Sequence, residues 1–342
     1  MFLENIPYQY YLLAFGVILL IKGGDWFVDA ATGIARRFKL PELLIGATVV
    51  SIGTTLPEVL TSAMAAASNN AATAYGNAIG SIICNTSLIA AITIAIKPAK
   101  ADKKTLIFPV CFFFGAAAFY SFCAYYFNSF PRWTGIVLLV GFVAYMIINV
   151  VNMKKNPVEQ ELPEIEEQGE ESEEKSSSLG FIKDIGMLVV SAAIIAVGAH
   201  LLGDNAQWLA EVQLGIPGEI VSLTIVALAT SLPELVTAIT ALAKGHGALS
   251  LGNIIGANIF NLVLVSGAAI TIAPFDIPSG TQLLGQSASL LIDVPLVFLV
   301  MGIMTIPTIL KGKLQRWQGI SLLAIYVSYV VFQVVMALAF AG

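Results

Sequence analysis

Charged side chains are scarce in this chain. Asp, Glu, Lys and Arg make up 11% of its 342 residues, whereas a soluble domain carries roughly a quarter. Apolar residues make up 57%, and the mean hydropathy is +0.85. These residues fall in runs of about twenty or more, which at about 1.5 Å per residue match the roughly 30 Å hydrocarbon core of a bilayer. The shortage of charge therefore excludes a soluble protein and predicts an all-α membrane protein.

Cysteine and catalytic motifs are also lacking. The three cysteines, Cys84, Cys111 and Cys123, lie in apolar runs without the spacing of a metal site or a disulfide framework. There is no phosphate-binding P-loop and no HExxH motif, so ATP-driven transport and zinc hydrolysis lack support. No nucleophile–base constellation indicates a membrane enzyme, and the first residues do not resemble a removable signal peptide. We expect no enzyme activity, no cofactor and no nucleic-acid partner.

The apolar runs predict ten membrane spans in two groups of five. Residues 1–152 hold the first group, residues 153–180 form a polar linker, and residues 181–342 hold the second group. Several spans are longer than twenty residues, which predicts tilted or discontinuous helices. The predicted spans are 8–33, 40–68, 71–97, 104–127, 132–152, 181–210, 216–243, 247–273, 282–309 and 315–340.

Negative and positive charge are both placed unevenly. The net charge of −5 arises in residues 159–174, which hold nine glutamates. Such a segment cannot bury enough apolar surface to fold, so it is either a disordered spacer or a regulatory segment that senses Ca²⁺. In the ten-span layout the basic residues lie in loops on one side, except Arg132 in the opposite loops and Lys22 within the first span. The positive-inside rule then predicts a cytoplasmic linker and two outside termini.

Two segments of the chain repeat at a constant offset of 176 residues. SIGTTLPE at 51–58 matches ALATSLPE at 227–234, and GNAIGSIICN at 76–85 matches GNIIGANIFN at 252–261. Five spans are an odd number, so the second copy enters the membrane in the opposite orientation. Inverted repeats are typical of transporters that work by alternating access, with the binding site near the midplane.

Each copy places a glutamate inside an apolar span. Glu58 and Glu234 follow a proline in their motifs. A carboxylate within a membrane is costly unless it is paired or hydrated, so both are candidate functional residues. The alternative is that each proline only bends its helix and each Glu pairs with a base, for which Lys22 is the candidate at this depth.

The prolines also predict exposed backbone oxygens. Proline removes a helical hydrogen bond and frees the carbonyl four residues before it, Gly53 in the first copy and Ala229 in the second. We expect the helix to unwind there, which is tolerated at membrane depth where the backbone lines a cavity or meets a ligand. Such oxygens, together with carboxylates and hydroxyls, are the hard ligands that Ca²⁺ prefers, and they also suit Na⁺. The neighbouring hydroxyls belong to Thr54, Thr55, Thr230 and Ser231.

The next span in each copy carries a polar helix face. Positions four residues apart lie on one face of a helix. The asparagines have two possible roles, ion ligation and hydrogen bonding between helices. Ligation is considered for Asn85 and Asn261, which are expected beside the Glu motifs. Glycines at 76 and 80, and at 252 and 256, predict close helix approach. The polar-face positions are Asn77, Ser81 and Asn85 in the first copy and Asn253, Ala257 and Asn261 in the second.

Charge balance predicts the class of cargo. Two carboxylates that face each other in a low-dielectric site repel strongly when the site is empty. One divalent cation neutralises them, and so would two monovalent cations or two protons. If the site must always hold either the divalent cation or the monovalent ions, one kind of ion can leave only when the other replaces it. Such a site is a basis for exchange. A passive cation channel could also use two facing glutamates, although the inverted repeat argues against it.

These motifs resemble the two alpha-repeats of the calcium/cation antiporter superfamily, in its sodium/calcium exchanger branch of prokaryotic type. The resemblance rests on GTTLPE with GNxxGSxxxN and on ATSLPE with GNxxGANxxN, and it covers the whole ten-span layout. It implies exchange of Na⁺ for Ca²⁺ across a plasma membrane, with spans 1 and 6 as sliding gate helices. It also implies a Ca²⁺ site made by Glu58, Glu234 and the carbonyls of Thr54 and Thr230. The implied flanking Na⁺ sites use Thr55, Ser231, Ser81 and the carbonyls of Ser51 and Ala227.

The chain departs from that family pattern at two positions. Ala257 stands where the family often has Ser, so one hydroxyl of a Na⁺ site is missing. Asn261 stands where potassium-dependent relatives carry Asp, which argues against K⁺ co-transport. Proton/calcium exchangers place a glutamate soon after the GN pair, and this chain has 78–80 Ala-Ile-Gly and 254–256 Ile-Ile-Gly instead. A Ca²⁺/H⁺ antiporter is therefore the alternative function.

Five other polar residues have open roles. Asp25, Asp29 and Asp204 are expected near the ends of the gate helices, either attracting cations or paired locally. Asp293, two residues before a proline, is expected in a buried pair or a functional role. His200 is interpreted as a hydrogen-bonded packing residue rather than a ligand.

Overall fold

Long apolar helices build the molecule in the computed structural model, which describes residues 7–155, 178–214, 227–278, 282–283 and 285–340. Within these residues, nine helical stretches are long and apolar enough to cross a membrane. The prediction of an all-α membrane protein is confirmed. The helices of the first half are α1 (Tyr8–Arg37), α2 (Glu42–Ile45), α3 (Ser51–Ala67), α4 (Ala71–Cys84), α5 (Ala91–Ile96), α6 (Lys103–Phe127) and α7 (Arg132–Lys155). Those of the second half are α9 (Ser178–Trp208), α11 (Ala227–Thr230), α12 (Leu232–Ala243), α13 (Gly247–Phe260), α14 (Ser266–Ile272), α15 (Val294–Lys311) and α16 (Arg316–Phe340).

Some predicted boundaries differ from those observed. The linker 153–180 falls largely outside the described residues, with α7 reaching Lys155 and α9 beginning at Ser178. The span 216–243 is described from 227 onward. The span 282–309 starts too early, because 282–287 form the short strands β3 (Gln282–Leu283) and β4 (Gln286–Ser287), with Gly285 at a φ of +79°. A second pair of short strands, β1 (Ser129–Phe130) and β2 (Phe275–Asp276), joins the two halves.

Wide π-helical turns interrupt several of the long helices. They are η1 (Gly46–Val50), η2 (Asn85–Ala90), η3 (Leu209–Gln213), η5 (Asn261–Val265) and η6 (Ser289–Asp293). The turns η2 and η5 begin at Asn85 and Asn261, which are related by the 176-residue offset. Such turns are rare and are frequent at functional sites. The repeat seen in the sequence is thus also a repeat of irregular backbone.

The helix α13 lies at the centre of the bundle. Its membrane span is the most buried among the described residues, and it packs against α2, η1 and α12. A Cβ at Gly252 would collide with the Leu43 carbonyl, and one at Gly256 with Ala47 and the Ser51 side chain. These glycines therefore allow the second copy to approach the backbone of the first, as predicted. For Gly76 and Gly80 the described part of the chain leaves open space, because the residues that would match α2 and η1 by the offset lie outside it.

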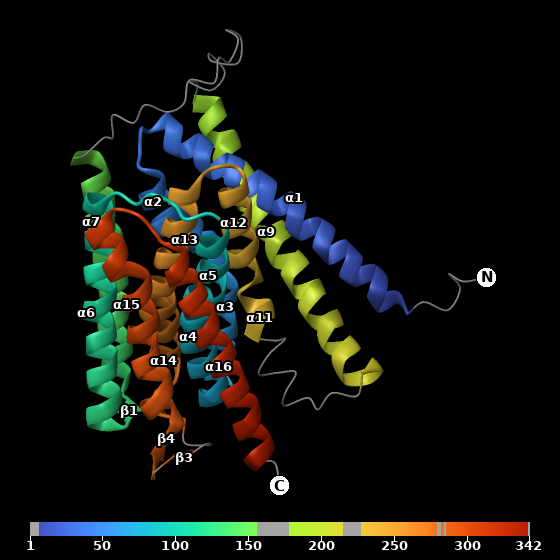
Figure 1. The fold of residues 1–342 in the computed structure, drawn as a ribbon, viewed down its shortest axis with the longest axis vertical. Coiled ribbons are helices and arrows are strands. Elements are labelled where there is room, and N and C mark those ends of the chain that lie inside the picture. The colour runs from blue at the N-terminus through green and yellow to red at the C-terminus, as the bar shows by residue number, and fades with distance from the viewer. Residues whose placement is uncertain (1–6, 156–177, 215–226, 279–281, 284, 341–342) are drawn as a thin grey trace.

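The helices α1 and α9 form a pair along one side of the bundle. Figure 1 shows α1 running obliquely to the upright helices α6 and α7, with α9 beside it. A Cβ at Gly16 would lie 3.0 Å from the Gly198 carbonyl oxygen, and one at Gly198 would lie 3.0 Å from the Gly16 carbonyl oxygen. The two helices therefore contact each other through paired glycines. Arg37 on α1 adds an ion pair of 3.2 Å to Asp184 on α9.

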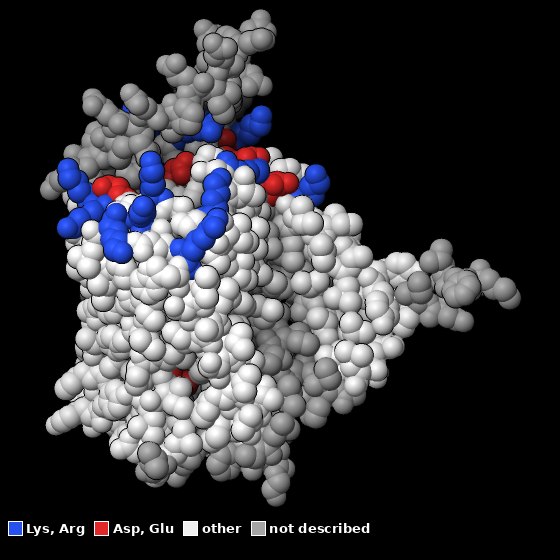
Figure 2. Space-filling model, in the orientation of Figure 1, with Lys and Arg blue, Asp and Glu red and all other residues white. Residues whose placement is uncertain are grey.

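Charge gathers at one end of the molecule. Figure 2 shows Lys and Arg clustered where the ends of α7 and α9 that flank the linker lie, with a largely uncharged face beyond them. Tyr and Trp side chains are exposed near the other end, among them Tyr126 and Trp133. Such a distribution is typical of a protein that crosses a bilayer.

Candidate ion-binding site

The two motif glutamates lie inside the protein. Glu58 on α3 and Glu234 on α12 are both 0% exposed. Their carboxylates are near enough to repel each other electrostatically. In the described part of the chain neither forms an ion pair, and Lys22, the base considered as a partner, is exposed. The two negative charges therefore have no basic side chain to neutralise them there.

A hydrogen bond joins the two repeats at this level. Thr55 Oγ1 on α3 donates to Glu234 Oε1 on α12 at 3.3 Å. Glu234 Oε2 and both carboxylate oxygens of Glu58 are buried and have no partner among the described residues. Buried polar atoms are rarely left without a partner. These free oxygens can accept a cation.

The backbone beside the two prolines differs between the copies. We expected unwinding in both. In the first copy α3 continues as a helix through Pro57, and the irregular turn η1 lies upstream of it. In the second copy the helix is interrupted at Ser231, between α11 and α12. Proline is compatible with the first turn of a helix, which is where Pro233 lies in α12. The prediction of unwinding is wrong for the first copy, where α3 accommodates Pro57 within a continuous helix.

The four motif asparagines divide into two kinds. Asn77 Nδ2 donates to the Glu58 carbonyl oxygen at 3.1 Å and to Ser62 Oγ at 2.8 Å. Asn253 Oδ1 accepts from Thr54 Oγ1 at 3.3 Å and is 3.3 Å from Ser51 Oγ. Asn77 thus fixes its own repeat, whereas Asn253 ties α13 to the other repeat. These contacts are the interhelical hydrogen bonds considered as an alternative role.

The other two asparagines have no such partners. The side chains of Asn85 and Asn261 are 0% exposed, and their amide oxygens and nitrogens lack a hydrogen-bond partner among the described residues. Each lies at the start of a π-helical turn. Their amide oxygens are therefore available to a ligand, whereas the Asn253 amide oxygen already accepts from Thr54.

The remaining predicted ligands line the same helices. Ser231 is buried and its hydroxyl lacks a described partner, while Ser51 and Ser81 are also buried. Thr230 is half-buried at the end of α11, and Ala227 begins that helix. Ala257 is 0% exposed and adds no polar atom. Hydroxyls are thus more numerous on the side of the first repeat.

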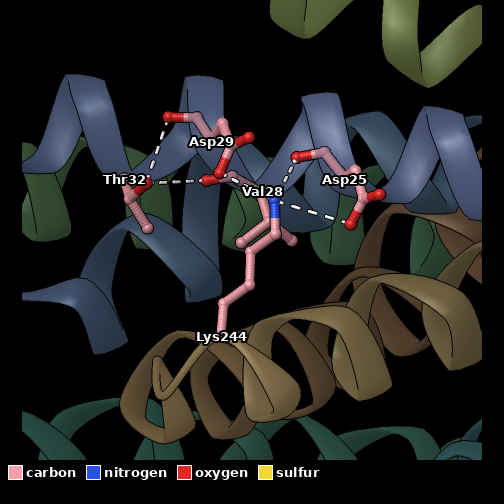
Figure 3. Close-up of polar contacts among 5 residues, drawn as sticks. All are labelled: Asp25, Val28, Asp29, Thr32 and Lys244. Atoms are coloured by element: carbon pink, nitrogen blue, oxygen red, sulfur yellow. Dashed lines mark hydrogen bonds and ion pairs between the residues drawn. The ribbon is translucent and has the colours of Figure 1, made fainter.

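Figure 3 shows a contact that the sequence did not predict. Lys244, just after α12, reaches α1, where its Nζ lies 2.8 Å from Asp29 Oδ1 and 3.5 Å from Asp25 Oδ1. It also donates to the Asp25 carbonyl oxygen at 2.9 Å. Both aspartates lie within α1, away from its ends, which corrects the expected position. They are paired, and the pair connects α1 to the end of α12.

Both histidines take part in polar contacts. His246 Nδ1 lies 2.7 Å from Glu42 Oε1 and so joins the start of α13 to α2. His200 Nε2 lies 3.3 Å from Asp204 Oδ2, one turn along α9. The His200 side chain is 75% exposed, so its interpretation as a packing residue is wrong. Asp204 is paired with a residue on its own helix, which was one of the two roles expected for it.

The site is thus a buried set of hard oxygens at the contact of two inverted repeats. It carries two carboxylates, two unpartnered amides and several hydroxyls. Oxygen ligands of this kind suit Na⁺ and Ca²⁺ and offer nothing to a soft metal. The described residues contain no cluster of three or more His, Cys, Asp or Glu side chains, so a resident metal centre of that type is not found among them.

Comparison with known proteins agrees with this architecture. The family model described as sodium/calcium exchanger protein matches residues 8–151 and 183–335. The sodium/calcium exchanger MaX1 of Methanosarcina acetivorans is 29% identical over 354 residues, covering 95% of this chain and 98% of the relative. An uncharacterized membrane protein of Methanocaldococcus jannaschii is 34% identical over 327 residues, covering 93% and 95%. The inner membrane protein YrbG of Escherichia coli K12 is 33% identical over 291 residues, covering 83% and 86%.

Solved structures share the fold. A structure of the sodium-calcium exchanger NCX_Mj soaked with 10 mM Na⁺ and no Ca²⁺ superposes with a TM-score of 0.75 at 30% identity, covering 94% of this chain and 98% of the other. A second, soaked with 2.5 mM Na⁺ and 0.1 mM Ca²⁺, has a TM-score of 0.75 at 29% identity, covering 95% and 98%. The matched length takes in both repeats. The chain is an integral membrane cation antiporter and belongs to the sodium/calcium exchanger family.

Proposed function

We propose that this protein exchanges Na⁺ for Ca²⁺ by alternating access and does so without K⁺. The observation that carries the proposal is the junction between the repeats. There Thr55 of one copy donates to Glu234 of the other, and the Glu58 carboxylate has no partner among the described residues. In this proposal Glu58 and Glu234 bind Ca²⁺, together with the backbone carbonyls of Thr54 and Thr230.

Charge explains why the ions compete. Two ionised carboxylates without a basic partner make the empty site unfavourable, because they repel each other in a low-dielectric surrounding. One Ca²⁺ or two Na⁺ restore neutrality, so the protein changes conformation more readily with the site filled by one set or the other. If the protein changes conformation only when its site holds Ca²⁺ or Na⁺, the two ions are exchanged and neither leaks through alone.

The Na⁺ ligands flank the Ca²⁺ position in this proposal. On one side they are the hydroxyls of Ser81 and Ser231 and the Ala227 carbonyl. On the other side they are the Thr55 hydroxyl and the Ser51 carbonyl, whereas Ala257 supplies no hydroxyl there. The buried amides of Asn85 and Asn261 complete the set, and the absence of a third carboxylate at 261 supports independence from K⁺.

The charge distribution supports one orientation of the protein in the membrane. The clustered Lys and Arg side chains in Figure 2 support a cytoplasmic linker and outside termini by the positive-inside rule. With inward Na⁺ as the driving ion, the protein extrudes Ca²⁺. The oblique pair α1 and α9, which packs against α11 and α12 at the edge of the bundle, acts as the moving gate.

Ion substitution in proteoliposomes tests this function. The full chain is reconstituted into vesicles loaded with Na⁺, and Ca²⁺ uptake is measured after dilution into Na⁺-free medium, with choline-loaded vesicles as the control. We expect uptake that depends on internal Na⁺ and is unchanged by K⁺. Uptake driven by a pH gradient alone would identify a Ca²⁺/H⁺ antiporter instead. Uptake that needs no counter-ion would identify a passive channel.

A further inference from the structure

A third buried carboxylate lies outside the ion-binding site. Asp293 ends the turn η6, directly before α15, and is 9% exposed. It takes part in none of the ion pairs of the described residues. The far end of α15 is Lys311, which is about 27 Å away at about 1.5 Å per residue. Asp293 therefore lies toward the end of the molecule opposite the Lys and Arg cluster.

Hydrogen-bond donors from α16 point toward this carboxylate. Tyr329 Oη donates to Asp293 Oδ1 at 3.1 Å, and Gln333 Nε2 donates to Tyr329 Oη at 2.8 Å. The chain of donors ends on Asp293 as the acceptor. Neutral donors stabilise a buried negative charge but do not cancel it.

Two buried tyrosine hydroxyls interact with the same carboxylate. The helix α15 packs against α4, α6 and α16. Tyr75 on α4 and Tyr120 on α6 are each 3% exposed, and their Oη atoms have no hydrogen-bond partner among the described residues. Both interact electrostatically with Asp293, and each also interacts with a serine hydroxyl, Tyr75 with Ser289 and Tyr120 with Ser266. The titratable groups that face Asp293 from these helices are therefore tyrosines, with no base among them.

We propose that Asp293 is a second binding site, which holds one monovalent cation, either a proton or Na⁺. Asp293 has no ion-pair partner among the described residues, and a buried charge of that kind is neutralised by a proton or a counter-ion. One carboxylate needs one positive charge, and a divalent ion would leave an excess. The Tyr75 hydroxyl, which interacts with Asp293, and the Asp293 carboxylate provide oxygens for that cation. The site is separate from Glu58 and Glu234 and does not depend on the proposed exchange.

Infrared difference spectroscopy tests this site without using transport. The Glu58→Gln/Glu234→Gln variant of the full chain, which lacks both central carboxylates, is purified and examined for the C=O stretch of a protonated carboxyl group. Spectra are taken on replacing choline by Na⁺ at fixed pH and on raising the pH in choline. We expect a carboxyl band to disappear in at least one of the two series, and to be missing when Asp293→Asn is added.

Two further variants make the assignment specific. Asp276→Asn removes an exposed carboxylate of β2 and should leave the band unchanged. Tyr329→Phe keeps the Asp293 carboxylate but removes its donor, so the band should persist at a shifted frequency. Monodisperse elution and a cooperative melting transition show that each variant is folded.

The outcomes separate the two cations. Loss of the band on adding Na⁺ means that Na⁺ displaces a proton from Asp293, and loss only on raising the pH means that the site takes a proton alone. A spectrum that Asp293→Asn does not change, in either series, overturns the proposal.

Discussion

Lys244 Nζ lies 2.8 Å from Asp29 Oδ1 and 2.9 Å from the Asp25 carbonyl oxygen, so the end of α12 is tied to the middle of α1. The aspartates are four residues apart, about 6 Å along a helix, and they share one face of α1. If α1 slides past α12 during transport, Lys244 has to exchange one carboxylate for the other or release both.

Removing this tie should change the rate of exchange more than ion affinity. An exposed ion pair contributes about 0.2–1 kcal/mol, so we expect Lys244→Met to alter turnover by up to about fivefold and to leave the half-saturating Ca²⁺ concentration unchanged. Initial rates of Na⁺-dependent Ca²⁺ uptake check this. The exchanged pair Lys244→Glu with Asp29→Lys should return the rate toward that of the original protein. Equal rates in Lys244→Met and the original chain would show that the contact does not restrain α1.

Replacing either central glutamate should abolish exchange. Glu58→Gln or Glu234→Gln removes one of the two negative charges that Ca²⁺ balances, and we expect Na⁺-dependent Ca²⁺ uptake to fall to background while the protein remains folded. Glu211→Gln, which changes a glutamate hydrogen-bonded to Gln207 at the end of α9, is the matched control and should transport normally. Full activity in either central variant would remove that residue from the site.

An additional carboxylate at 261 should change cation selectivity. Asn261 is buried without a described partner, so Asn261→Asp would bring the buried charge of the site to three. A third monovalent ion is then needed for neutrality, and we expect uptake to become dependent on K⁺ or more dependent on Na⁺. Ca²⁺ uptake with K⁺ or choline on the Na⁺ side measures this. Asn261→Ser, which adds no charge, serves as the comparison, and identical ion dependence in the two variants would contradict the prediction.

The two GN asparagines should differ when each is changed to alanine. Asn253→Ala removes the amide oxygen that accepts from the Thr54 hydroxyl of the other repeat, and losing such a buried bond lowers the free energy of unfolding by about 1–3 kcal/mol. The Ser51 hydroxyl keeps the backbone carbonyl oxygens of Gly46 and of residue 253 as acceptors. Asn77→Ala loses contacts within its own repeat. We expect both variants to melt at a lower temperature than the original protein. We also expect Asn253→Ala to raise the half-saturating Na⁺ concentration more than Asn77→Ala does. An equal Na⁺ dependence would show that the bond between repeats does not position the Na⁺ ligands.

The constant offset in the sequence predicted which residues the two repeats bring together, but not how they touch. Glu58 and Glu234 could be identified because a carboxylate in an apolar span is rare and a duplicated one rarer. The bond from Thr55 to Glu234, and the contrast between Asn253 and Asn77, depend on how the helices pack and on positions where the two copies differ. Thr55 corresponds to Ser231, and Ser51 corresponds to Ala227.

Other features were hidden because they join parts of the chain with no shared pattern. Lys244 and His246 look like ordinary loop residues, yet they contact α1 and α2 more than two hundred residues away. Pro57 predicted an unwound helix, but α3 continues through it, and the irregular turn η1 lies at 46–50 instead. Local sequence indicates that a helix must deviate, while packing decides at which residue.

The length of α1 has a mechanical consequence. Its 30 residues would measure about 45 Å, longer than the roughly 30 Å hydrocarbon core, so it must lie obliquely in the bilayer. A thinner or thicker bilayer changes the tilt at which α1 matches the hydrocarbon core, and each Å of mismatch costs fractions of a kcal/mol. Because α1 and α9 are packed together at Gly16 and Gly198, a change in the tilt of α1 also changes the tilt of α9. We therefore expect the acyl-chain length of the bilayer to affect the turnover of the exchanger.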